Sequence, residues 1–104
     1  MIVNTETISG RQLETLGMVK GSTIQAKHVG KDIMSGLKGL VGGELTAYAD
    51  MMNTARAKAT KLMVEEAQQM GADAVVNVRY TSAAVMQGAA EILVYGTAVR
   101  FAAK

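Results

Sequence analysis

The chain has 104 residues, of which 49% are hydrophobic, and it carries 11 Lys and Arg against 9 Asp and Glu. This length fits one domain over residues 1–104, because a second hydrophobic core would need more residues. The sequence has no Cys and a single His, which excludes disulfide frameworks, thiolate nucleophiles, iron–sulfur clusters and a paired-His site within one chain.

The first elements alternate between strand patterns and glycine-rich patterns. Residues 1–9 alternate weakly and predict an edge strand. Residues 16–27 carry Val, Thr and Ile between glycines, which predicts a strand bent at Gly21. Residues 30–44 repeat Gly and aliphatic side chains every three or four positions, which predicts a short helix weakened by glycine.

The strongest periodicity of the chain lies over residues 44–70. Apolar side chains recur there at helical spacing, namely Tyr48, Met52, Ala55, Ala59, Leu62, Met63, Ala67 and Met70. This spacing predicts a long amphipathic helix, whose alanines permit the close approach of a sheet. Gly71 follows directly and is the residue type that commonly ends a helix.

Two strands are predicted in the last third, over residues 73–82 and 90–103, and Gln87 and Gly88 between them predict a hairpin. Period-two alternation divides the first of these strands into two faces, one with Ala74, Val76, Val78 and Tyr80 and the other with Val75, Asn77, Arg79 and Thr81. The second strand is apolar on both faces, with Leu93, Tyr95, Thr97, Val99 and Phe101 opposite Ile92, Val94 and Ala98.

These elements predict an α+β domain of two layers, with one long helix on an antiparallel sheet. A single helix covers one face of such a sheet, so the apolar second face of the last strand needs another cover. We expect that cover to be a second copy of the chain in a closed homo-oligomer, with Ile92, Val94 and Ala98 at the subunit contact. The alternative is that residues 31–41 cover this face within the same chain.

One candidate site is a metal site at the single imidazole. His28 has Asp32 four residues further on. With Glu44 these residues could bind a metal ion, or His28 and Asp32 could orient one another as base and carboxylate. Tight transition-metal sites generally use several nitrogen or sulfur ligands. A surface or interface position for His28 is therefore the favoured interpretation.

A second candidate site lies at the start of the long helix. Gly42 and Gly43 directly precede this helix, and Glu44 lies in its first turn. Backbone N–H groups at a helix start can hold a phosphate or carboxylate, but the glycine spacing matches neither a P-loop nor a dinucleotide fingerprint. Glycines that allow close packing are the favoured alternative.

In a ring of subunits Arg79 could hold an anion or an acidic side chain, with a solvated sheet edge as the alternative.

Other classes of function find little support in the sequence. No block of basic residues interleaved with aromatic ones marks a nucleic-acid surface, and no apolar stretch is long enough to span a membrane. The N-terminal MIVNTETIS lacks the charged and apolar regions of a secretory signal, so we expect a cytoplasmic protein. An enzyme is the least expected class, because no nucleophile–base pair can be written without His28.

Several motifs of the chain resemble those of the YbjQ-like family. They are GMVKG at 17–21, Lys31-Asp32-Ile33, Gly42-Gly43-Glu44 with Tyr48, Ala55-Arg56, GADAVVNVRY from Gly71 and EILVYGTAV from Glu91. The resemblance covers nearly the whole chain and implies a dodecin-like two-layer fold, a pentameric ring and a heavy-metal-binding label. Some relatives have acidic residues on the strand after GA-x-AV. This chain has Asn77, Arg79 and Thr81 there, which leaves Asp32, Glu44 and Glu91 as the matched carboxylates.

We therefore predict a homopentameric protein that binds a small ligand or acts as a scaffold. Its candidate ligand-binding residues are Gly42, Gly43, Glu44 and Arg79. A metal-ion-binding module that uses His28, Asp32 and Glu44 is the alternative. The sequence identifies no cofactor, and the expected partner is the chain itself, with neither nucleic acid nor membrane.

Overall fold

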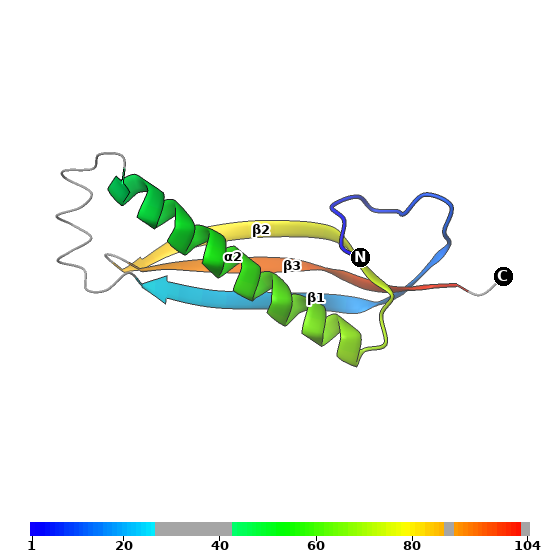
Figure 1. Ribbon diagram of the computed structural model, residues 1–104. Helices are drawn as coiled ribbons and strands as arrows, with labels where there is room; N and C mark the ends of the chain where they lie inside the picture. The colour runs from blue at the N-terminus through cyan, green and yellow to red at the C-terminus, as the bar shows by residue number, and fades with distance from the viewer. Residues whose placement is uncertain (27–42, 87–88, 103–104) are drawn as a thin grey trace.

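The computed structural model describes residues 1–26, 43–86 and 89–102. They form strand β1 (Leu13–Ala26), helix α2 (Gly43–Gln69) and strands β2 (Ala74–Met86) and β3 (Ala89–Phe101). The strands make one antiparallel sheet in the order β1-β3-β2, and α2 crosses one of its faces (Figure 1). The predicted α+β arrangement of one long helix on an antiparallel sheet is confirmed. The predicted glycine-rich helix lies almost wholly outside the described residues.

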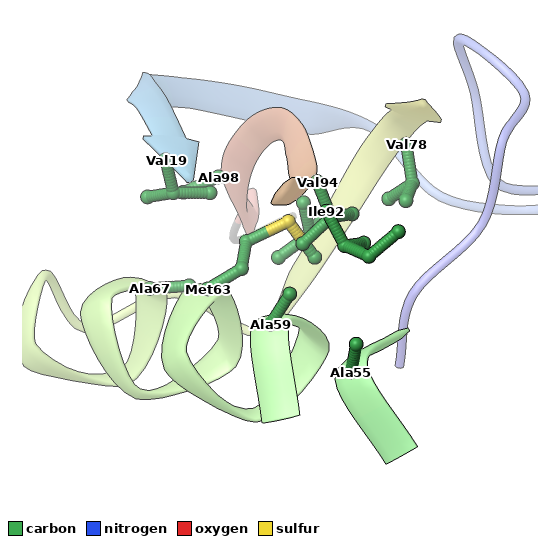
Figure 2. Packing of buried hydrophobic residues seen from close by; sticks show 10 residues of the cluster. Val19, Ala55, Ala59, Met63, Ala67, Val78, Ile92, Val94 and Ala98 are labelled. Atoms are coloured by element: carbon green, nitrogen blue, oxygen red, sulfur yellow. The ribbon is translucent and has the colours of Figure 1, made fainter. Parts of the chain in front are cut away.

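Helix α2 and the sheet enclose the main hydrophobic core. We call the sheet face that α2 covers the near face, and the opposite one the far face. Four side chains of α2, spaced four residues apart, are buried against the near face: Ala55, Ala59, Met63 and Ala67. Figure 2 shows Met63 reaching from the helix towards Ile92 and Val94. The alanines let the helix backbone come close to the sheet while Met63 fills the space between them.

The helix comes closest to β1 at Gly21. A Cβ atom at Gly21 would overlap the carbonyl oxygen of Ala59 and lie 2.7 Å from the backbone nitrogen of Met63. Further along β1, the Thr23 hydroxyl donates a hydrogen bond of 3.0 Å to the carbonyl oxygen of Ala55. Accordingly α2 lies mainly over β1 and β3 and contacts β2 least.

The N-terminal segment, residues 1–12, runs beside β2 and then returns to β1 at one end of the sheet (Figure 1). The N–H of Val3 donates to the carbonyl oxygen of Val75 at 2.9 Å, and the N–H of Val78 donates to that of Val3 at 3.0 Å. The pairing is parallel and forms a single bridge, between Ile2 and Val75. The edge strand predicted over residues 1–9 is thus reduced to one bridge.

This segment also covers one end of the far face. A second cluster of apolar side chains forms there, in which the buried Ala74, Val76 and Val99 pack against Val3, Ile8, Leu13 and Phe101. Part of the second sheet face is therefore covered by the start of the same chain. The segment that we expected as an intrachain cover, residues 31–41, lies outside the described residues.

An irregularity in β2 reverses the faces predicted for its second half. Asn77 has a φ of 55°, and the register with β3 shifts between Val76 and Arg79. Such a bulge adds one residue to the alternation, so the side chains that follow it point to the other face, up to a second register shift between Ala84 and Met86. Val76 consequently lies in the far-face cluster, whereas Tyr80 faces α2, where its hydroxyl lies 2.7 Å from that of Thr60.

Candidate functional site

A groove lies on the far face between the N-terminal segment and the sheet. Its volume is about 510 Å³, which falls within the ~300–1,000 Å³ common for small-ligand sites. We call it the N-terminal groove, and its lining residues are Glu6, Thr7, Arg11, Leu13, Thr15, Val76, Asn77, Thr97 and Val99. The groove combines an apolar floor, several hydroxyl groups and one side chain of each charge.

The floor and walls of the N-terminal groove come from all three strands. Val76 and Val99 are 3% and 2% exposed and belong to the far-face cluster. Thr15 lies opposite Val99 and Thr97 lies opposite Val76 in the sheet pairing. Residues that are directly opposite one another share a sheet face, so both threonines stand beside this apolar floor.

Asn77 forms part of the wall at the bulge. Among the described residues other than glycine, it alone has a positive φ, and its N–H donates a 2.9 Å hydrogen bond to the carbonyl oxygen of Thr5. A left-handed conformation costs an L-residue roughly 1–2 kcal/mol, although Asn adopts it more readily than most residues. Bulges and strained residues concentrate beside functional sites, which favours the N-terminal groove as the candidate site.

Arg11 and Glu6 carry the charges of the groove. The guanidinium carbon of Arg11 lies 4.4 Å from the centre of the Phe101 ring, a cation–π contact that holds the side chain at the rim. In the part of the chain that the structure describes, the one ion pair joins Arg100 and Glu14. Neither Arg11 nor Glu6 forms an ion pair with another of these described residues. Neither residue could be singled out from the sequence, because only the folded chain brings the N-terminal segment beside the sheet.

Arg79, a predicted ligand-binding residue, holds the N-terminal segment in place. Its guanidinium donates hydrogen bonds of 2.8 Å to the carbonyl oxygen of Asn4 and 3.1 Å to that of Val78. Because the adjacent Tyr80 faces α2, Arg79 points to the far face. Gly43 begins α2 over the near face, so the structure does not bring Arg79 and Gly43 together.

We expect Arg79→Ala to loosen the first residues of the chain. Hydrogen bonds from a charged donor contribute about 1.5–3 kcal/mol, so the amide protons of Val3 and Val78 should exchange with solvent at least about tenfold faster. Arg100→Ala is the matched control, since it removes an exposed ion pair that contributes about 0–1 kcal/mol. Unchanged amide protection in Arg79→Ala would show that the backbone hydrogen bonds alone hold the segment.

The remaining predicted ligand and metal residues lie at or before the start of α2. Gly43 is the first residue of α2 and Glu44 is the second. Gly42, His28 and Asp32 lie outside the described residues. The metal set of His28, Asp32 and Glu44 therefore stays a prediction.

The three side chains predicted at a subunit contact are core residues of the single chain instead. Ile92, Val94 and Ala98 are 2%, 0% and 0% exposed, and they pack under α2 in the main core (Figure 2). Of the two apolar faces of β3, the helix covers the one that carries these three residues. Their assignment to an interface is thereby corrected, and the uncovered apolar face is the far face.

Beyond the N-terminal groove, the far face carries exposed apolar side chains. Met18 is 76% exposed, Ile24 is 61% exposed and Tyr95 is 39% exposed. Lys20 lies opposite Tyr95 in the sheet, and residues an even number of positions apart on a strand share a face. We call this surface, which also includes the half-buried Leu93, the open far face.

Over the described residues, no helix combines the length and hydropathy that a membrane span requires.

The donor groups of the described residues do not fit a heavy-metal ion. Soft metals are bound best by thiolates, and the sequence has no Cys. Within residues 1–26, 43–86 and 89–102, no three His, Cys, Asp or Glu side chains come together. Glu91, one of the matched carboxylates, accepts a 2.9 Å hydrogen bond from the Ser22 hydroxyl. These parts of the chain therefore supply no metal centre.

The fold is similar to that of a solved protein of unknown function from Pediococcus pentosaceus, which belongs to the DUF74 family. The TM-score is 0.67 at 12% sequence identity, and the match covers 98% of this chain and 97% of that one. At this identity the likeness concerns the fold alone.

Sequence comparison gives much closer relatives. A UPF0145 protein of Alkaliphilus metalliredigens is 71% identical, over 97% of this chain and 98% of the relative. A UPF0145 protein of Clostridium novyi is 65% identical, over 96% and 97% of the two chains, and one of Methanosarcina acetivorans is 63% identical, over 96% and 95%. Residues 1–102 match the YbjQ family model, which is described as "Putative heavy-metal-binding". The chain therefore belongs to the YbjQ family, with the UPF0145 proteins as its relatives.

Proposed function

We propose that the protein is a homo-oligomeric binding protein rather than an enzyme, with a small ligand in the N-terminal groove and self-association through the open far face. A pentameric, dodecin-like ring is the assembly that we propose. The observation that carries this proposal is the exposure of Met18, Ile24 and Tyr95 on one face of the sheet.

These side chains expose apolar area to water, and burying that area favours self-association. Burying apolar surface contributes about 25 cal/mol per Å², and soluble monomers seldom leave a contiguous apolar patch uncovered. Strand β1 is also an edge of the sheet and is 14 residues long, and long edges are usually paired or covered. Lys20 and Glu91 place one charge of each sign on the same face, which suits contact between identical copies.

Sedimentation velocity at micromolar concentration tests the proposed assembly. The wild type should sediment as a species of five times the 10.9 kDa chain mass, and Met18→Glu should shift it towards the single chain. Leu62→Glu is the matched control, because Leu62 is a 45% exposed apolar residue on α2. A monomeric wild type would overturn the proposal, and so would dissociation by Leu62→Glu with an intact Met18→Glu assembly.

A further inference from the structure

We infer that the N-terminal groove binds a small aliphatic zwitterion of the amino-acid class, with the ligand's carboxylate at Arg11 and its ammonium group at Glu6. The inference rests on the proposed function, since it names the ligand of the groove. It starts from two opposite charges that line one groove and form no ion pair within the described residues.

The guanidinium of Arg11 is already oriented to bind a carboxylate. Its guanidinium lies over the Phe101 ring at 4.4 Å, so one face of the group is covered and its orientation is restricted. A guanidinium held in this way can donate two parallel N–H bonds from its edge to a carboxylate. Because the side chain is already positioned, less conformational entropy is lost when the ligand binds.

Glu6 supplies the complementary charge for an ammonium group. It lies on the same N-terminal segment as Arg11 and lines the same groove, together with the Thr7 hydroxyl. A carboxylate and a hydroxyl both accept hydrogen bonds from an ammonium group. A ligand with one charge would satisfy either Glu6 or Arg11, whereas a zwitterion satisfies both.

The floor of the groove selects an aliphatic side chain. Val76 and Val99 are almost fully buried, and Leu13 lines the groove beside them. An aliphatic group placed on this floor would bury its own apolar surface and part of the half-buried Leu13, which is favourable. The threonine hydroxyls of Thr15 and Thr97 lie beside the floor and remain available for polar atoms near the ligand's backbone.

Calorimetric titration of the full chain with L-leucine tests this inference. L-Leucinamide lacks the carboxylate and N-acetyl-L-leucine lacks the ammonium charge, so each should bind about tenfold more weakly than L-leucine. Amide NMR signals of Asn77, Thr97 and Val99 should move on addition of L-leucine. Equal affinity for all three compounds would overturn the inference.

Variants assign each ligand charge to its residue. Glu6→Gln should weaken L-leucine about tenfold and leave N-acetyl-L-leucine unchanged. Arg11→Gln should weaken L-leucine to the same degree and leave L-leucinamide unchanged. Arg11→Lys keeps the charge but loses the two parallel N–H bonds, so it should weaken L-leucine by less than Arg11→Gln does. Glu14→Gln and Arg100→Gln are the matched controls, since they change the charges of an exposed ion pair that does not line the groove. Loss of binding in these controls would contradict the assignment.

The neutral polyol erythritol separates the failure of this inference from the failure of the proposed function. If erythritol moves the amide signals of Asn77 and Thr97 but L-leucine does not, the groove is a ligand site and the zwitterion is wrong. If none of the four compounds moves these signals, the inference is overturned together with the proposed ligand site. The sedimentation of the wild type then decides separately whether self-association stands.

Discussion

We expect Val94→Asp to abolish the folded state. Val94 is 0% exposed and lies in the main core, on the middle strand of the sheet. An aspartate there would lose the burial of the valine side chain, at roughly 1.5–3 kcal/mol, and would bury a carboxylate without a partner, at roughly a further 3–5 kcal/mol. Together these costs reach the lower part of the about 5–15 kcal/mol that is typical of the total stability of a domain. The variant should therefore lose the far-ultraviolet circular dichroism of the folded chain.

Tyr95→Asp is the matched control, because Tyr95 is the next residue on the same strand and is 39% exposed on the open far face. This variant should keep the circular dichroism of the wild type and lose the assembly. The two variants thus separate the core of one chain from the contact between chains. A Val94→Asp protein that stays folded and only dissociates would contradict the burial of this residue beneath α2.

The long helix could be predicted from the sequence because its signal is local and repeated. A buried side chain recurs every four residues from Ala55 to Ala67, and α2 begins and ends one residue from the predicted bounds of 44 and 70. The hairpin of β2 and β3 is also local, since its period-two pattern and its turn lie in one stretch of sequence. Local periodicity was sufficient for α2, β2 and β3 and for the layering of the helix on the sheet.

The N-terminal groove could not be predicted, because its parts meet only in the folded chain. Glu6 and Arg11 join side chains from all three strands, and no local pattern records such distant neighbours. The bulge could not be predicted either. One extra residue within β2 leaves no recognisable mark in the sequence pattern, although it reverses the faces of the side chains that follow it. The one hint at the bulge is Asn77 itself, a residue type that tolerates positive φ.

The choice between the two apolar faces of β3 also depends on distant residues. Period two alone does not say which face the helix covers, and this ambiguity placed the predicted interface in the core. The covered face is marked by Gly21, where a Cβ would overlap the backbone of α2. A glycine on the sheet opposite the alanines of α2 therefore indicates where the helix lies.

The close approach at Gly21 leads us to expect that Gly21→Ala destabilises the chain, although it adds only a methyl group. Exchanging Gly for Ala normally stabilises by about 0.4–1 kcal/mol, because the unfolded chain loses freedom. Here the new Cβ would overlap the carbonyl oxygen of Ala59 and lie 2.7 Å from the backbone nitrogen of Met63. Backbone atoms cannot rotate away, so α2 itself must shift. Overpacking of this kind costs about 1–3 kcal/mol, which outweighs the gain from the unfolded state.

Urea and thermal unfolding measure this effect. The urea midpoint of Gly21→Ala should fall, and its Tm should drop by roughly 4–8 °C for each kcal/mol lost. Ser22→Ala is the matched control, because Ser22 points to the far face and loses only its 2.9 Å hydrogen bond to Glu91, worth about 0.5–1.5 kcal/mol. A Gly21→Ala variant as stable as the wild type would contradict this close approach. The backbone of α2 would then lie further from β1, and Met63 would have to fill a wider gap between the helix and the sheet.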